Sequence, residues 1–338
     1  MEPLMGGAAT QASERVGHAL ADRLLVGLRA IVRAREFGIL LFLILTIIAL
    51  SIARPTFATQ SNFLAMGRQM SEITIIAIGM TFLITSRELD LSVGSVFGFS
   101  TLFMALMAQD HGIDLWLALG MSFGVAATIG LVNGLVTTVG RIPSFIVTLG
   151  MLYIVRGLTL KLSAYPVARI EHPTFYRVLA GELLGVPTQI FWMVGITILA
   201  TLIYRRTTFG YQVRATGSNE VAARLAGIPV NRVKLACFVL TAAAAAFAGA
   251  LSFARLTSVS PTAGTGLELT TIAAVVIGGT SLFGGQGTVV GTFLGAALLT
   301  VVRNGLVQLG WEGRLQEAFL GAIVILAVLI HTHAGRRR

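Results

Sequence analysis

Hydrophobic residues lie along this chain in long runs that are separated by short polar segments. About ten of these runs approach the roughly 20 residues that an α-helix needs to cross the hydrocarbon core of a bilayer. They lie at about 37–53, 66–86, 93–108, 115–138, 143–160, 188–204, 235–254, 267–280, 287–306 and 315–331. The pattern predicts an all-α integral membrane protein with about ten transmembrane helices.

Two parts of this pattern leave alternatives open. The run at 93–108 is short, so it is either a span or part of a re-entrant unit with the preceding run. Residues 1–36 have no apolar core followed by a small-residue cleavage site, so we expect no cleavable signal. Leucines and isoleucines at helical spacing in this segment predict either an amphipathic helix on the inner membrane surface or a solvated leader.

Composition and charge agree with a membrane protein. Hydrophobic residues make up 55% of the 338 residues and charged residues only 12%, about half the soluble average. The net charge of +10 is compatible with nucleic-acid binding or with basic cytoplasmic loops, and a chain this apolar favours the loops. Ten spans place both termini on one side, together with most of the basic residues. Both termini, including a basic tail at 332–338, are therefore predicted to be cytoplasmic.

The strongest interruption of the apolar pattern is the segment 205–234, which we predict to be a cytoplasmic loop. It contains six basic residues and one acid, Glu220. No other segment of similar length is as cationic, so the loop is a candidate for contact with a partner as well as an anchor for the topology.

A short helix with clear ends is predicted inside this loop, from about Glu220 to Ala226. Ser218 or Asn219 can cap its first turn through a side-chain oxygen. Gly227 can take the left-handed conformation that ends a helix, and the proline two residues later prevents its continuation. Because a helix of about two turns is marginal alone in water, it needs something to pack against.

Signs of an enzyme are weak. The chain has two lysines, Lys161 and Lys234, and neither follows glycine as a phosphate-binding loop requires. No two histidines have the i, i+4 spacing of a helical metal site, and one cysteine allows no internal disulfide. We therefore predict no catalytic residue, metal or cofactor in this chain.

A glycine-rich corner lies between the eighth and ninth runs. Its glycines let the backbone turn tightly and approach its neighbours closely. They are Gly278, Gly279, Gly284, Gly285 and Gly287. No basic residue accompanies them in the sequence, which favours a structural turn over an anion site.

A second corner follows the second run and contains Asp90, Ser92 and Gly94. Asp90 and Ser92 can cap the next helix. The alternative is a proton or sodium site within the membrane, because acids inside the bilayer are costly and usually functional. Arg87 and Glu88 indicate a membrane edge, which favours capping.

Polar residues within the runs either hold helices together or line a polar path. Considered alone, Asn133 and Asn304 are predicted to hold helices together. With Phe145 and Thr148 they are also the candidates for a translocation path. The unbroken alanines from Ala242 to Ala246 predict close helix packing.

Four stretches carry a resemblance to a known family across residues 37–331. They lie at 90–95, 140–150, 217–234 and 276–288, in the same order as in that family. With these motifs the chain resembles the permease subunit of a bacterial ABC importer of the ribose and monosaccharide type. The chain departs from it at Arg87-Glu88-Leu89, where members often have two glycines and an isoleucine, and at Ser218, where a glycine is frequent.

The resemblance implies a transport subunit of a bacterial inner membrane rather than an enzyme. Two such permeases, identical or paired, would sit on two cytoplasmic ABC ATPases, which bind ATP and Mg²⁺, and a periplasmic binding protein would deliver a monosaccharide. The short helix would be the coupling helix, seated in a groove of the ATPase. Its contact and cap residues would be Asn219, Glu220, Ala223, Arg224 and Gly227.

Two other functions stay open at this stage. An amino-acid permease of a related ABC importer would share most of these features. An ion-coupled secondary transporter needs an acid deep in a span, and its candidates, Glu72 and Glu268, both lie near the predicted ends of spans. The predicted outer loop at 161–187 is the main candidate for contact with a molecule outside the cell.

Overall fold

The computed structural model describes residues 36–167 and 170–313, together with 315, 316, 318, 319, 321, 322 and 325. Three predictions fall largely outside these residues. They concern the N-terminal segment before Glu36, most of the last apolar run at 315–331, and the basic tail at 332–338.

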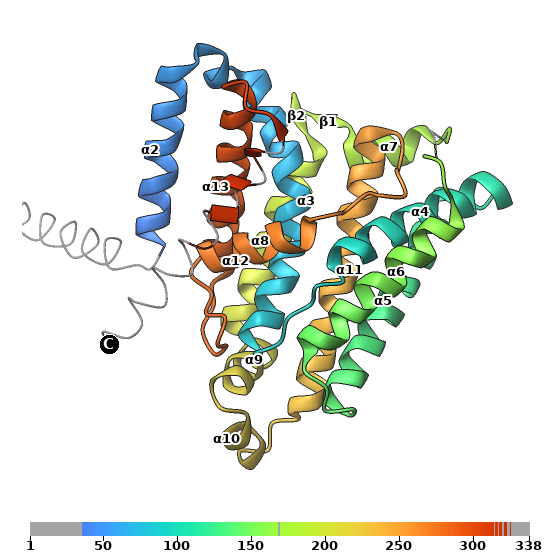
Figure 1. Ribbon diagram of the computed structural model, residues 1–338, viewed down its shortest axis with the longest axis vertical. Helices are drawn as coiled ribbons and strands as arrows, with labels where there is room; N and C mark the ends of the chain where they lie inside the picture. Colours follow the sequence, from blue (N-terminus) through green and yellow to red (C-terminus); the bar gives the residue numbers. More distant parts are fainter. Residues whose placement is uncertain are drawn as a thin grey trace, which may run out of the picture.

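The described residues form a bundle of helices (Figure 1). In chain order its elements are α2 (Phe37–Ala53), η1 (Pro55–Ala58), α3 (Gln60–Thr85), α4 (Val93–His111), α5 (Leu115–Thr138), α6 (Ser144–Leu162), α7 (Pro173–Ala180), β1 (Glu182–Leu183), β2 (Val186–Pro187), α8 (Thr188–Arg206), α9 (Thr208–Ser218), α10 (Glu220–Leu225), α11 (Val230–Leu256), α12 (Leu267–Ile277) and α13 (Val289–Gln308).

Six of the described helices are long and apolar enough to cross a membrane: α4, α5, α6, α8, α11 and α13. The chain is therefore an all-helical membrane protein, as the hydrophobic pattern predicts. Helices α2 and α5 have the predicted bounds. Helix α3 begins at Gln60 rather than 66, because polar residues in its first turns hide its start in the sequence.

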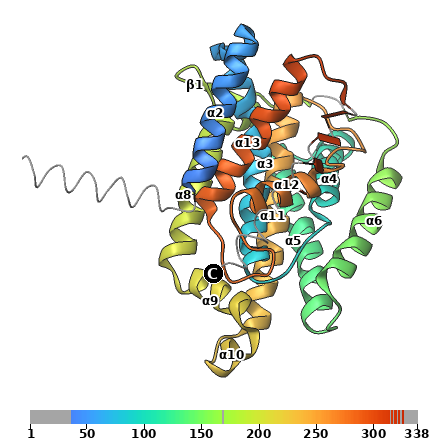
Figure 2. The same cartoon turned by 60° about the vertical axis from the view of Figure 1, so that its left-hand side comes forward.

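Helix α11 lies in the centre of the bundle, between α3, α4 and α5 (Figures 1 and 2). Most of its alanines are buried, and glycines of the neighbouring helices face it closely. A Cβ added at Gly79 of α3 would lie 2.9 Å from the Cα of Thr241, and one at Gly130 of α5 would lie 2.8 Å from the carbonyl oxygen of Phe238. The predicted close packing along Ala242–Ala246 is confirmed.

The two ends of the bundle differ in structure. Helices α9 and α10 project at one end, which we call the α10 end, and α7 and the β1–β2 hairpin lie at the opposite end (Figure 1). In the hairpin, Glu182 pairs with Pro187 and Leu183 with Val186 in antiparallel register. The predicted outer loop thus contains a short helix and a small hairpin.

The predicted loop at 205–234 is mostly helical. It contains α9 as well as α10, and α9 was not predicted. Its polar sequence gives it little apolar pattern, although the Thr207 side chain caps it by accepting a hydrogen bond from the backbone N–H of Gly210 at 3.3 Å. Buried Val213 and Gly217 show that tertiary packing stabilises α9.

Candidate functional site

The short helix α10 has the ends that the sequence predicts. The Asn219 side chain accepts a hydrogen bond from the backbone N–H of Ala222 at 3.0 Å. Gly227 has a φ of +80°. Backbone hydrogen bonds from Gly227 to Arg224 and from Ile228 to Ala223, both 3.0 Å, close the last turn. Of the two predicted caps, the structure uses Asn219.

The faces of α10 differ from the prediction in one respect. Ala223 is buried against the protein, so it does not face outward as a contact residue. Val221 and Leu225, one turn apart, are instead 69% and 85% exposed. Their i, i+4 spacing was the signal that sequence reasoning missed.

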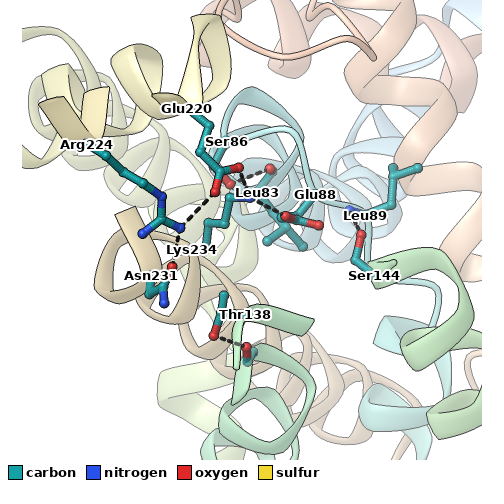
Figure 3. Close-up of polar contacts among 11 residues, drawn as sticks. Leu83, Ser86, Glu88, Leu89, Thr138, Ser144, Glu220, Arg224, Asn231 and Lys234 are labelled. Atoms are coloured by element: carbon teal, nitrogen blue, oxygen red, sulfur yellow. Dashed lines mark hydrogen bonds and ion pairs between the residues drawn. The ribbon is translucent and has the colours of Figure 1, made fainter. Parts of the chain in front are cut away.

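Glu220 is the centre of the charges on α10. Its carboxylate pairs with Arg224 at 2.8 Å and accepts a hydrogen bond from Lys234 of α11, also at 2.8 Å (Figure 3). Arg224 also donates to the side-chain oxygen of Asn231. The hydrogen bond from Lys234, opposed by partial burial, is the main reason that the pKa of Glu220 lies below its ordinary value.

Lys234 also reaches the segment between α3 and α4. Its Nζ lies 2.7 Å from Oε1 of Glu88, and both side chains are only 10% exposed (Figure 3). Sequence reasoning missed this pair, because nothing local in the sequence connects two residues so far apart. We call the set of Glu88, Glu220, Arg224 and Lys234 the ion-pair cluster.

The segment Ser86–Ser92, which contains Glu88, is held by side chains of α6. The backbone N–H of Leu89 donates to Oγ of Ser144 at 3.1 Å, and that of Leu91 donates to Oγ1 of Thr148 at 3.0 Å. Thr148, a candidate for the translocation path, therefore has a structural contact with this segment.

Asp90 does not cap α4 directly and does not lie at an exposed edge. It is fully buried, and its Oδ1 accepts from the backbone N–H of Ser92 at 2.7 Å and from its hydroxyl at 2.6 Å. Asn133 of α5 donates to the same hydroxyl at 2.9 Å. Ser92 occupies the N-cap position but makes no side-chain cap bond to the described residues. Asp90, Ser92 and Asn133 therefore join α5 to the start of α4.

A cavity of about 780 Å³ opens beside the ion-pair cluster. It lies where the end of α5 and the start of α6 face α10 and α11. The cluster lines one side, and Thr137, Thr138 and Ser144 line another. The paired groups therefore border open space instead of a continuous apolar core.

The glycine-rich corner packs against the C-terminal end of α9. The backbone N–H of Gly285 donates to the carbonyl oxygen of Thr85 at 2.9 Å. A Cβ added at Gly217 would lie 1.7 Å from that same oxygen, so no larger residue fits there. Gly284 contacts Arg87, which itself has a φ of +70°. The fold thus brings a basic residue to a corner that has none in the sequence.

The other predicted turn glycines also allow close contacts. Gly279 has a φ of +86°. At Gly278, an added Cβ would lie 2.6 Å from the backbone of Gly291. At Gly287 it would lie 2.4 Å from the hydroxyl of Thr85, and at Gly94 it would lie 2.2 Å from a carboxylate oxygen of Glu268. The structural-turn interpretation agrees with this geometry.

The four candidates for a translocation path do not meet in one cavity. Asn304 of α13 exchanges two amide hydrogen bonds with Asn62 of α3, at 2.9 and 3.1 Å, which joins those helices. Phe145 is exposed on α6. Asn133 and Thr148 instead contact the 86–92 segment. Their role in a path stays a prediction.

The position of Glu72 differs from the prediction. Because α3 begins at Gln60, Glu72 lies near the middle of this helix and not at a span end. It is buried and accepts from Nε of Arg255, near the end of α11, at 2.9 Å. Glu268 does lie in the first turn of its helix, α12.

At the opposite end of the bundle, a second polar contact joins α5 to α7. Asp114 caps α5 by accepting from the backbone N–H of Trp116 at 2.9 Å, and its other oxygen lies 2.8 Å from Nε2 of His172. Nδ1 of His172 accepts from the backbone N–H of Phe175 at 3.2 Å. The hydrogen bond with His172 is the main reason that the pKa of Asp114 lies below its ordinary value.

The fold and this site define a polytopic helical membrane protein with a short, ion-paired helix at one end of the bundle. Its residues 62–328 match the family described as the permease component of a branched-chain amino acid transport system, and the chain belongs to this family.

Among its relatives is the ribose import permease protein RbsC of Escherichia coli, which is 38% identical over 298 residues, covering 86% of this chain and 92% of the relative. The protein of the same name from Bacillus subtilis is 37% identical, with 88% and 92% covered. The L-arabinose ABC transporter permease protein AraH of Azospirillum brasilense is 35% identical, with 89% and 88% covered. No solved structure matches the chain.

Proposed function

We propose that this chain is the permease subunit of an ATP-driven importer and passes a monosaccharide across the bacterial inner membrane. Its membership of a permease family supports the class of transporter. Relatives named for ribose and for L-arabinose, each similar over most of both chains, support a sugar over an amino acid.

The proposed topology has about ten transmembrane helices in residues 37–331 and both termini in the cytoplasm. Residues 1–36 and the tail at 332–338 would then lie on the cytoplasmic side with α10. The basic residues of segment 205–234 support this orientation, because positive charge is retained on the cytoplasmic side.

The observation that carries the coupling role is the exposed apolar face of α10. Val221 and Leu225 project away from the bundle beside the charged pair of Glu220 and Arg224. A short helix that docks into a groove on a partner protein has this pattern of apolar anchors beside charged residues. We assign that groove to a cytoplasmic ABC ATPase, which would bind ATP and Mg²⁺.

A monosaccharide needs a transport protein to cross the membrane, because its hydroxyl groups lose their hydrogen bonds with water in hydrocarbon. A periplasmic binding protein would supply the sugar and the selectivity. A second permease, identical or homologous, would complete the path. Closure of two ATPases on ATP would move the α10 helices and exchange outward and inward openings.

Transport of a branched-chain amino acid is the second candidate, because the description of the matching family names that substrate class. Uptake into vesicles that contain the purified chain, its ATPase and its binding protein separates the two. We expect ATP-dependent uptake of labelled ribose or L-arabinose, and no uptake of labelled leucine. Leucine uptake without sugar uptake would reject the monosaccharide assignment.

Docking of the ATPase through α10 has its own test. We expect Leu225→Asp to prevent co-purification of the ATPase with the tagged chain, because a charge replaces an apolar anchor. Leu184→Asp is the control, since Leu184 is also highly exposed but lies in the hairpin turn at the opposite end. Equal recovery of the ATPase with both variants would refute docking through α10.

A further inference from the structure

Lys234 connects two segments that lie far apart in the sequence. Its ammonium group lies 2.8 Å from Glu220 on α10 and 2.7 Å from Glu88 in the segment between α3 and α4. One carboxylate belongs to a peripheral helix and the other to the interior of the protein. The geometry is that of a bridge, because one cation holds both (Figure 3).

The inner side of this bridge is firmly attached. The segment Ser86–Ser92 is bonded to α6 through Ser144 and Thr148, and its last residue is bonded to Asn133 of α5. The same segment leads directly into α4. A displacement of Glu88 is therefore applied at the point where α4, α5 and α6 are joined.

The outer side of the bridge lies on a short helix at the edge of the bundle. Helix α10 has only six residues and packs against α9 and the start of α11. Lys234 lies in the second turn of α11, the central helix of the bundle, and its side chain extends toward both carboxylates. The adjoining cavity leaves room for the partners to change position.

We propose that Lys234 is a positioning residue that transmits displacements of α10 to the segment Ser86–Ser92, and so to the helices around the translocation path. This inference rests on the proposed function, in which an ATPase moves α10. Both side chains of the inner pair are 10% exposed, so salt and water screen the pair less than they would a surface pair. The side chain of Glu220 is 37% exposed, so the bond between Lys234 and Glu220 is screened more, and the pair with Glu88 is the stronger half of the bridge.

The cluster allows stability and coupling to be tested separately. Lys234→Met alone leaves the buried Glu88 without its cation, which destabilises the fold. The double variant Glu88→Ala/Lys234→Met removes both members of the pair, and Glu220 keeps its pair with Arg224. The double variant therefore lacks the connection but has no buried charge left unpaired.

The experiment uses vesicles that contain the complete importer and measures sugar transported per ATP hydrolysed, with a thermal melt of each purified variant. We expect the double variant to melt close to the wild type and to transport roughly tenfold less sugar per ATP. Lys234→Arg should keep most of the coupling. Arg232→Met is the matched control, because it removes an exposed cation of the same helix and should change neither quantity.

A merely structural role predicts a different result. In that case the double variant would recover stability and transport together, and our inference would be wrong. If Leu225→Asp uncouples the importer while the double variant stays coupled, α10 acts without Lys234; that result rejects the inference and leaves the proposed function intact. If the wild-type chain shows no ATP-dependent sugar uptake, the proposed function itself fails.

Discussion

Helix α11 has an ion-paired cation near each end, Lys234 buried and Arg255 partly buried, and the two cations are used differently. Lys234 near its start pairs with Glu88, which follows α3, and Arg255 near its end pairs with Glu72 within α3. The distances, 2.7 and 2.9 Å, are nearly equal. One pair joins α11 to α3 itself, and the other joins it to the segment Ser86–Ser92 that follows α3.

The difference lies in what else each cation holds. Lys234 shares a second carboxylate, Glu220, on the six-residue helix α10. The partner of Arg255 belongs to α3, a central helix of 26 residues. The same chemistry thus fixes two long helices together at the opposite end of the bundle and connects a peripheral helix at the α10 end.

The largest effect on stability should follow from breaking the pair of Arg255 and Glu72, which joins α11 to α3. Arg255→Met leaves Glu72 buried without a cation, which we expect to cost about 3–5 kcal/mol of stability. The double variant Glu72→Met/Arg255→Met should regain most of that stability, because no buried charge is left unpaired. Thermal unfolding in detergent measures both.

Transport sharpens the comparison between the two ends. The Glu72/Arg255 double variant should recover uptake per ATP together with stability, in contrast to the double variant at Lys234. A stable Glu72/Arg255 double variant that does not couple ATP hydrolysis to uptake would show that the two ends do not differ in the way described.

Packing at the two ends should differ as well. Gly217→Ala at the α10 end places a Cβ 1.7 Å from a carbonyl oxygen, which cannot give way without moving α9, and we expect a loss of about 1–3 kcal/mol. Gly67→Ala in α3 meets the flexible tip of Ile190 instead and should cost less. The melting temperatures of the two variants measure this difference. Equal losses of stability in both variants would contradict the prediction.

A smaller effect is expected at the cap of α10. Asn219→Ala removes the hydrogen bond to Ala222 and should cost about 1 kcal/mol. Asn219→Asp keeps an acceptor and should retain the cap. Hydrogen exchange of the α10 amides measures the effect directly; unchanged protection in Asn219→Ala would mean that packing alone holds the helix.

The smallest effect concerns pH. The pKa of Glu220 lies below its ordinary value of 4.5, mainly through the hydrogen bond from Lys234, so its contribution is fully present above that pH. The contribution is lost as the pH falls through the lowered value. The melting temperature of the wild type should therefore be higher than that of Glu220→Gln at pH 6, and this difference should disappear in acid. A difference that persists in acid would contradict this assignment.

Local signals in the sequence were sufficient for several elements. The bounds of α2 and α5 follow from their apolar runs, and the ends of α10 follow from Asn219 and Gly227. In each case the residues that specify the structure lie within or beside the element itself. The resemblance to permeases of the ribose type is confirmed by the match of residues 62–328 to a permease family together with the similarity to ribose and L-arabinose permeases.

Contacts between distant segments could not be predicted in this way. The pair of Lys234 with Glu88 depends on how α11 passes the end of α3. The burial of Asp90 and the central position of Glu72 depend on neighbouring helices and on an α3 start that polar residues conceal. One partial signal was present: Glu88 stands where similar permeases often have glycine, so its charge required a partner.

Photo-crosslinking from α10 tests the central claim most directly. With the single cysteine, Cys237, replaced by alanine, a benzophenone-maleimide label is placed at Leu225→Cys, or at Leu184→Cys as the control. We predict that light joins the Leu225 label to the ATPase subunit of the assembled importer and that the Leu184 label gives no such product. An ATPase product from Leu184 and none from Leu225 would contradict the account.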